Sequence, residues 1–392
     1  MVPWRGGFPP PPTSELSELS EASDMPSPPL PMFSPAFLKL LRLGLWSDIP
    51  CGPEVIFPAP LSLSEWKAIA DEASRQAVAG IVYAGIERLP DTILPPPSGL
   101  VRWVAAAGAI ETQNLRISGA ITSLARIFSE AGLNPVLLKG HSVARHYARP
   151  ELRQSGDIDI YFPATGEFGR ASDIVASLGH QPERHSDGSM VYDFRGVVVE
   201  HHPELLDLYA SGHRREAKRI IAAEGFVPSP DFPGMLEPSP VLEYLLVSTH
   251  IMKHSFGVGV GLRQICDYAR LRNDLAKMTD GAVPAALTDS LGLSRWTAVL
   301  DDFVEVFLDP VPESGVPTTK LPSVISPLCR SFARIVFGGG NFGVHDPVRS
   351  RLVSPVAIRA YAALSFLRRA RFSLRISPSE ALAQAARLAL RK

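Results

Sequence analysis

The chain has 392 residues, 45% of them hydrophobic and 20% charged, a composition typical of a globular protein with an extensive core. A formal net charge of −1 excludes a general electrostatic attraction to nucleic acid or to an anionic membrane. The three cysteines, Cys51, Cys266 and Cys329, are too far apart to form a C-x-x-C pair, so they indicate neither a disulfide framework nor a zinc knuckle and fit a reducing cytoplasm.

Proline dominates the beginning of the chain. Ten of the 37 prolines precede Ala36. Such a segment buries too little apolar surface to offset the entropy of ordering, so residues 1–34 are predicted to form a disordered leader. A passive leader and a proline-rich docking tail both agree with this composition. The leader has no apolar core behind a basic region, and we therefore expect no secretory signal.

Helical periodicity follows over residues 35–132, which we expect to be a helical region. Apolar residues recur at helical spacing in three shorter segments, 36–47, 62–76 and 77–89. Ser62 or Ser64 is a candidate N-cap for the second segment.

A long alanine-rich helix is predicted over residues 99–131. It stops at Gly132, because glycine readily adopts the left-handed conformation that ends a helix. Arg102 and Glu111 interrupt its most apolar part, which is therefore too short to cross a bilayer.

Strand and helix patterns alternate over residues 133–210. The predicted order is a strand in 134–140, a helix in 141–148, a strand in 156–163, a helix in 167–179 and a hairpin in 189–202 that turns at Arg195-Gly196. From about residue 212 the pattern is helical again, interrupted by loops at 229–240 and 338–343. The chain is therefore predicted to be α+β, with a small mixed β-sheet embedded between helical regions 35–132 and 211–392.

Two aspartates occupy the third predicted segment, in the sequence GDIDIYFP. Side chains alternate along a strand, so Asp157 and Asp159 project from one face. Like charges so close repel each other, and a divalent cation such as Mg²⁺ would stabilise them. A third acid on a neighbouring strand would complete such a site. Glu200 is the best candidate, with His202 on the same face, and Asp193 and Glu204 are the weaker options; a solvated strand face is the plain alternative.

The residues before the two aspartates favour phosphate. Gly140 ends one predicted strand and opens a helix, where free backbone N–H groups attract anions. Ser142 could add a hydroxyl group, while Lys139 and Arg153 could balance the charge of a triphosphate. Lys139 could equally be a lysine that only extends along the end of its strand.

These residues form a pattern that resembles the polymerase-β-like nucleotidyltransferases. More closely, the pattern resembles a family of uncharacterised bacterial nucleotidyltransferases with a Lys-Gly turn followed by Arg-x-x-x-Asp-h-Asp. The matching residues, between about 99 and 275, are Lys139, Gly140, Tyr147, Pro150, Arg153, Asp157, Asp159, Glu200, His202, His250, Lys253, His254, Arg263 and Asp267.

The resemblance implies that NMP, with AMP the expected group, is transferred from an NTP to an acceptor with release of pyrophosphate. Asp157 and Asp159 would hold two Mg²⁺ ions, and Glu200 would complete the catalytic metal site. The NTP, with ATP expected, would contact Lys139, Gly140, Ser142, Arg153, His202 and Lys253. The resemblance does not identify the acceptor, which could be a small molecule, a peptide, a protein or RNA.

Two residue pairs in the C-terminal half have competing interpretations. His250 and His254 share a helix face and could chelate zinc, but packing or substrate contact fits better because no third ligand is evident. Arg263 and Asp267 are also four residues apart, for which an intrahelical ion pair is the default and a role facing the site is the alternative.

The C-terminal tail is basic. Residues 347–392 contain ten arginines or lysines and one acid, Glu380. The tail could contact RNA, anionic lipid or an acidic partner, or it could be a solvated helical face. Two rival functions therefore remain beside nucleotidyl transfer: a non-catalytic nucleotide- or partner-binding module on the same fold, and an RNA-binding protein that acts through this tail.

Overall fold

The computed structural model describes residues 33–49, 60–185, 187–278, 285–310, 325–340 and 355–390. Most of the predicted leader, residues 1–32, lies outside this part of the chain. Phe33 and Ser34 belong to the folded unit that begins at Phe33. The Ser34 hydroxyl accepts a hydrogen bond from the Phe37 N–H at 3.1 Å and so caps the first helix.

The predicted N-terminal helices are confirmed as α2 (Pro35–Leu45), α3 (Leu63–Arg75) and α4 (Ala79–Ile86). Ser62 is the N-cap of α3, where it forms a capping box with Glu65. Helices α2 and α4 cross in close contact because glycines lie at the crossing. A Cβ atom on Gly85 would lie 2.1 Å from the Leu40 carbonyl oxygen, and one on Gly44 would clash with the Ile81 carbonyl oxygen.

The long predicted helix is α5 (Pro97–Glu130), which follows the short 3₁₀ turn η2 (Asp91–Ile93). It ends as predicted at Gly132, whose φ is +67°. The Gly132 N–H donates to the Ser129 carbonyl and the Leu133 N–H donates to the Phe128 carbonyl, both at 2.9 Å. This pair of bonds satisfies the last carbonyls of the helix.

A seven-stranded mixed sheet follows α5, so the predicted α+β class is confirmed. Its strands are β1 (Val136–Leu138), β2 (Asp157–Tyr161), β3 (Glu183–Arg184), β4 (Met190–Phe194), β5 (Val197–His202), β6 (Phe226–Pro228) and β7 (Leu236–Pro238). Their order in the sheet is β3-β4-β5-β2-β1-β7-β6. The central pair, β2 and β5, is parallel, while β1 is antiparallel to β2.

The predicted hairpin is confirmed by β4 and β5. Its two turn residues, Arg195 and Gly196, have φ values of +56° and +74°, as a tight two-residue hairpin turn requires. The Asp193 carboxylate accepts the Gly196 N–H at 2.8 Å, so this acid stabilises the turn.

Two predictions for connecting segments need correction. The predicted loop 229–240 contains β7, which pairs in parallel with β1, so the sheet extends beyond residue 210. The predicted helix 141–148 is only a single turn, α6 (His141–Ala144), and is followed by the 3₁₀ turn η3 (Pro150–Leu152).

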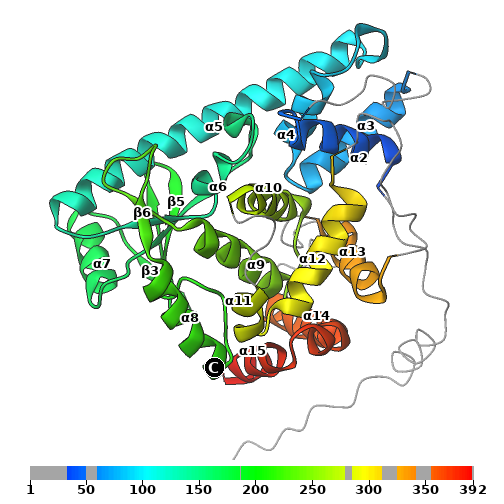
Figure 1. Ribbon diagram of the computed structural model, residues 1–392. Helices are drawn as coiled ribbons and strands as arrows, with labels where there is room; N and C mark the ends of the chain where they lie inside the picture. The colour runs from blue at the N-terminus through cyan, green and yellow to red at the C-terminus, as the bar shows by residue number, and fades with distance from the viewer. Residues whose placement is uncertain are drawn as a thin grey trace, which may run out of the picture. The chain divides into compact units, whose positions relative to one another are not determined.

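One face of the sheet packs against α5 and α7 (Glu167–Ser177), and this packing forms a hydrophobic core (Figure 1). Ile158 and Ile160 of β2 and Val197 and Val199 of β5 point into this core. Because side chains alternate along each strand, the acids of β2 and β5 project from the opposite face.

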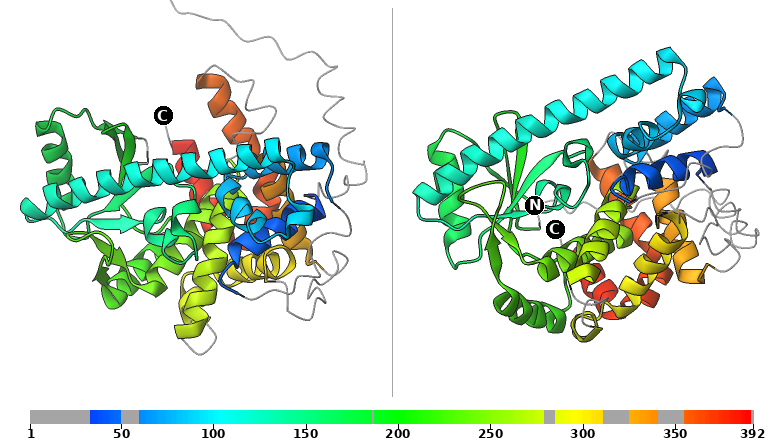
Figure 2. Two further views of the ribbon diagram at one scale, coloured as in Figure 1. Left: turned by 90° about the horizontal axis from the view of Figure 1, so that it is seen from above. Right: turned by 45° about the horizontal axis from the view of Figure 1, so that its top comes forward.

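The remaining helices come after β5. They are α8 (Ser211–Glu224), α9 (Pro240–Phe256), α10 (Leu262–Met278), α11 (Ala285–Ser290), α12 (Ser294–Phe307), α13 (Pro327–Gly339), α14 (Pro355–Ile376) and α15 (Pro378–Leu390). The first of them, α8, precedes β6 and β7. Helix α9 contacts β7, α10 and α14, so it connects the sheet to the later helices (Figure 2). Within the described residues, each helix is too short or too polar to span a membrane.

Candidate active site

The strand register brings the predicted acids together. Asp159 of β2 is the direct neighbour of Glu200 on β5, and Tyr161 is the neighbour of His202. The next residue of the same face along β2 is Asp157. Two neighbouring strands therefore present carboxylates and one imidazole from the face that is turned away from α5.

Asp159 is the most enclosed of these acids, with 4% of its surface exposed. Its Oδ2 lies 3.1 Å from Lys139 Nζ, and its Oδ1 lies 2.6 Å from His202 Nε2. Burial alone would raise the pKa of this carboxyl group, but Lys139 and His202 outweigh burial and hold the pKa well below its usual range. Asp159 is therefore ionised.

Lys139 reaches this carboxylate from a constrained turn. Its φ is +23°, an unfavourable value for a residue with a side chain, and Gly140 follows with φ +61°. Burial lowers the pKa of the Lys139 ammonium group, but Asp159, Asp157, Asp207 and Glu200 offset burial and raise it. The positive charge beside the two aspartates is thus partly supplied by the chain itself.

Asp157 lies at the exposed start of β2. Its pKa is raised, mainly because the charge on Asp159 disfavours a second negative charge and also because the surrounding protein removes part of the hydration of its carboxylate. Any cation that binds both carboxylates would relieve this repulsion.

The donor atoms fit a divalent cation. Asp159, Glu200 and His202 each offer one ligand atom, and these atoms lie within 4.8 Å of one another. Carboxylate oxygens suit Mg²⁺, and Asp157 adds another carboxylate beside the cluster. The predicted metal ligands are therefore grouped at one place on the sheet.

A cavity of about 250 Å³ opens over these acids between the sheet and helices α9 and α10. We call it the Lys139 cavity; its lining residues are Lys139, Gly140, Arg153, Asp157, Asp159, Glu200, Val247, His250, His254, Arg263, Gln264 and Asp267. Val247 and Gln264 were not among the sequence candidates, since neither residue type marks a site by itself.

Arg153 lines this cavity, but its guanidinium is held by Asp267. Arg153 donates to the Asp267 carboxylate through Nε at 3.1 Å and through a terminal nitrogen at 2.5 Å. The Tyr147 hydroxyl donates to the same carboxylate at 2.7 Å. Asp267 is thus paired with Arg153, and Arg263 on the same helix donates to the Gln154 carbonyl at 3.0 Å.

Arg263 also lines the cavity and is a further candidate for the phosphate-balancing cation. Burial and the neighbouring charge of Arg153 lower its pKa to about 10. An anion in the cavity would relieve both effects.

The two histidines of α9 also line the Lys139 cavity. Their ring centroids are 4.4 Å apart, and His250 Nδ1 lies 3.0 Å from Asp207 Oδ2. Burial lowers the pKa of His250 to about 4, so this histidine is neutral. Asp207 was not predicted; the signal was an acid inside the apolar run Leu205–Leu208.

Three candidate residues lie elsewhere. Lys253 pairs with Asp207 at 2.8 Å and lines a neighbouring pocket instead of the Lys139 cavity. Ser142 is buried, and its hydroxyl donates back to the Lys139 carbonyl. Since α6 has only four residues, the helix dipole expected to attract phosphate at Gly140 is small. Glu204 pairs with Arg214 away from the two aspartates.

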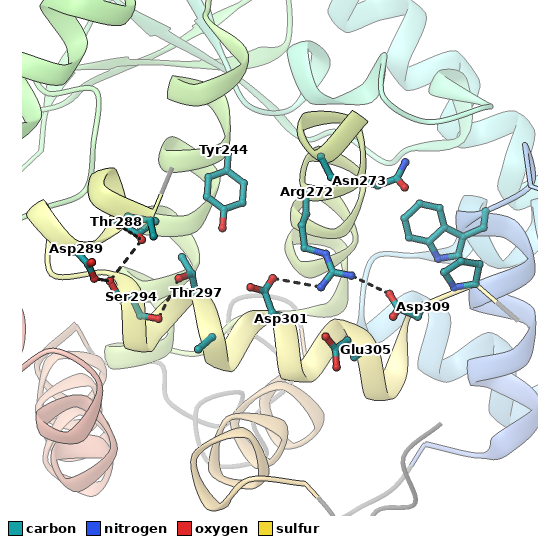
Figure 3. A pocket seen from close by; sticks show the side chains of 15 residues that line it. Tyr244, Arg272, Asn273, Thr288, Asp289, Ser294, Thr297, Asp301, Glu305 and Asp309 are labelled. Carbon is teal, nitrogen blue, oxygen red and sulfur yellow. Dashed lines mark hydrogen bonds and ion pairs between the residues drawn. The ribbon is translucent and has the colours of Figure 1, made fainter. Parts of the chain in front are cut away.

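A larger cavity of about 630 Å³ lies between α10 and α12 (Figure 3). Among the described residues that line it, the acids are Asp289, Asp301, Glu305 and Asp309, and the one cation is Arg272. Arg272 donates to Asp301 at 3.3 Å and to Asp309 at 3.0 Å. This excess of negative charge would repel a triphosphate, so the Lys139 cavity is the better nucleotide site.

Comparison with known protein families gives a match over most of the described core. The model of a family described as uncharacterised nucleotidyltransferase matches residues 62–299, which run from α3 to α12 and include the whole sheet. No curated protein and no solved structure matches the chain. The match covers more than half of the 392 residues. The chain therefore belongs to this family of uncharacterised nucleotidyltransferases.

Proposed function

We propose that the protein is a Mg²⁺-dependent nucleotidyltransferase that moves NMP from an NTP to an acceptor and releases pyrophosphate. AMP, supplied by ATP, is the expected group. The observation that carries this proposal is the register of Asp159 against Glu200, with Asp157 beside them, over the Lys139 cavity.

The metal-binding residues would be Asp157, Asp159 and Glu200, with two Mg²⁺ ions implied by the sequence resemblance. When bound, Mg²⁺ stabilises the negative charge that develops on phosphate oxygens. Lys139 and Arg263 add positive charge on the side of the triphosphate. His202 holds the Asp159 carboxylate in place through its 2.6 Å contact.

The reaction requires one bond exchange. The acceptor hydroxyl oxygen attacks the α-phosphorus, and the bond from this phosphorus to the bridging oxygen breaks as pyrophosphate leaves. The carboxylate of Glu200 accepts the proton of the hydroxyl group. Arg153 and Asp267 act as positioning residues, because their ion pair fixes the cavity wall beside Gly140.

One observation favours a second candidate, a nucleotide-binding module without catalysis. Lys139 and His202 already contact both oxygens of Asp159. This arrangement could persist in a protein that has lost transfer but retains the fold. The two candidates differ in turnover and agree in Mg²⁺·NTP binding.

The test is to incubate the protein with each α-labelled NTP, Mg²⁺ and a lysate of the host, and to follow label in acceptors. Asp159→Asn should lose transfer because it removes a metal ligand. Glu200→Gln should keep Mg²⁺·NTP affinity within a few-fold but lose turnover on the order of 10²-fold or more. Asp193→Asn is the matched control, because this acid serves the hairpin turn.

A wild-type protein that binds Mg²⁺·NTP without any transfer would favour the binding module. Equal transfer by Glu200→Gln and wild type would show that Glu200 does not accept the proton.

A further inference from the structure

A second pocket, of about 350 Å³, adjoins the Lys139 cavity at the end of β5. We call it the His202 pocket; its walls include His202, the segment 203–209, Lys253 of α9, and Ala383 and Arg387 of α15. Two contacts connect the linings of the two cavities. His202 Nε2 lies 2.6 Å from Asp159 Oδ1, and His250 Nδ1 lies 3.0 Å from Asp207 Oδ2.

The wall formed by α15 is fixed in place by hydrogen bonds. The Glu380 carboxylate, 1% exposed, accepts the backbone N–H groups of Tyr209 at 2.6 Å and Ala210 at 3.1 Å. His213 Nδ1 lies 2.7 Å from the same carboxylate. At the other end of this contact, the Arg387 guanidinium lies 5.1 Å from the centre of the Tyr209 ring and donates to the Asp187 carbonyl at 2.8 Å.

The charges around the His202 pocket are balanced. Lys253 pairs with Asp207 at 2.8 Å, and Arg214 pairs with Glu204 at 2.5 Å. A nucleic-acid backbone binds to surfaces with an excess of positive charge, which the described lining of this pocket lacks. The volume is near the lower end of the range for small-molecule sites, roughly 300–1,000 Å³.

We propose that the His202 pocket is the acceptor site and that it takes a small, polar, hydroxyl-bearing molecule without net charge. The proposal rests on the proposed function and names its second substrate. His202 Nε2 lies 3.9 Å from Glu200 Oε2, so an acceptor against His202 is beside the carboxylate that receives its proton. Its hydroxyl oxygen forms the new bond to the α-phosphorus as pyrophosphate leaves the Lys139 cavity.

The test fills the His202 pocket from the α15 side. Ala383→Trp places a bulky ring in the pocket, and Ala386→Trp is the matched control because Ala386 is exposed on the same helix. Ala383→Leu is a smaller intrusion, which guards against a failure of the tryptophan variant to fold. Each protein is measured for binding of a fluorescent ATP analogue with Mg²⁺ and for transfer from α-labelled ATP to the small-molecule fraction of the lysate.

The expected result is label on a small molecule with wild type and Ala386→Trp. The rate of this transfer should fall at least about tenfold in Ala383→Trp and should fall less in Ala383→Leu. All variants should bind the ATP analogue with wild-type affinity. Wild-type transfer by a folded Ala383→Trp protein would overturn the acceptor site alone, and so would label that appears on RNA or protein instead. If wild type neither binds the analogue nor transfers label, the proposed function fails as well.

Discussion

Buried charges in this protein occur in pairs that a single substitution would unbalance. The side chains of Arg153 and Asp267 are each 4% exposed, and each is the main charge partner of the other. Removing one member of such a pair leaves the other charge buried without compensation, which costs more than the pair itself contributes.

We therefore predict that Asp267→Asn lowers the free energy of unfolding by about 3 kcal/mol or more. Thermal and urea denaturation would measure this loss. Arg126→Ala is the control, since Arg126 and Glu130 form an exposed pair on α5 that contributes about 0.5 kcal/mol or less. Equal losses in the two variants would contradict a special role for the buried pair.

His146 gives a prediction for pH dependence. Its Nε2 lies 3.1 Å from Glu243 and its Nδ1 lies 2.9 Å from Asp274. Burial lowers the pKa of His146 and Arg145 lowers it further, but the two carboxylates outweigh both and raise it above the ordinary value of 6.5. A raised pKa in the folded state means that the stabilisation is fully present below about pH 6.5 and is lost as pH rises through the folded pKa.

His146→Gln should therefore lower the melting temperature more at pH 6 than at pH 9. Comparing each variant with wild type at the same pH cancels the titration of the other histidines. An equal loss at both pH values would show that the imidazole is not protonated between the carboxylates.

The placement of the acids could be predicted from sequence, but their surroundings could not. The alternation of Asp157, Ile158 and Asp159 already determines which residues share a face. The partner of Arg153 is 114 residues away in the chain, and nothing local indicates it. The same is true of Lys253, which the family pattern associates with the nucleotide and the structure pairs with Asp207.

Among the secondary-structure elements, the crossing of α2 and α4 depends most directly on residue size. Gly85→Ala would place a Cβ atom 2.1 Å from the Leu40 carbonyl oxygen, which is backbone and cannot rotate away. We predict a loss of about 1–3 kcal/mol in the free energy of unfolding from this overpacking. Gly119→Ala in α5 is the control: its Cβ meets nothing within 4 Å, so the higher helix propensity of alanine should give a gain of about 0.5–1 kcal/mol. Denaturation of both variants measures the contrast, and a stabilised Gly85→Ala would refute the close crossing.

The elements that the sequence predicted correctly carry strong local signals. Gly132 ends α5 and Arg195-Gly196 turns the hairpin because these positions require positive φ. The strands β6 and β7 were missed because each has three residues and ends in a proline, which leaves no alternation to detect. β7 forms by pairing with β1, a contact that is distant in sequence, and β6 in turn pairs with β7.

For the whole molecule, the basic tail has a structural role that its charge does not suggest. The one acid of this tail, Glu380, joins α15 to the segment after β5. Arg369 donates to the Gly257 carbonyl and Arg387 to the Asp187 carbonyl, so these two arginines are directed at the protein. RNA binding through the tail remains a rival hypothesis, for which these arginines are less available.

Glu380→Gln should loosen the attachment of α15. The amide keeps one acceptor oxygen but turns a donor toward backbone N–H groups, so a loss of about 1–3 kcal/mol is expected. Limited proteolysis with trypsin should then release α15 faster than from wild type. Glu216→Gln, at a surface pair on α8, is the control. Unchanged release would show that Glu380 does not hold the helix.

Helix α5 restricts the motion of the N-terminal helices relative to the sheet. Its 34 residues span about 51 Å as one rod, with α4 and η3 against its first half and β2 and β5 against its second (Figures 1 and 2). At its middle, the Asn114 amide donates to the Glu151 and Arg153 carbonyls at 2.8 and 2.9 Å. A rotation between the first helices and the sheet would have to bend this rod, because no linker separates them. The N-terminal helices therefore hold the end of α5 that lies away from the sheet. They are part of the scaffold that positions the sheet.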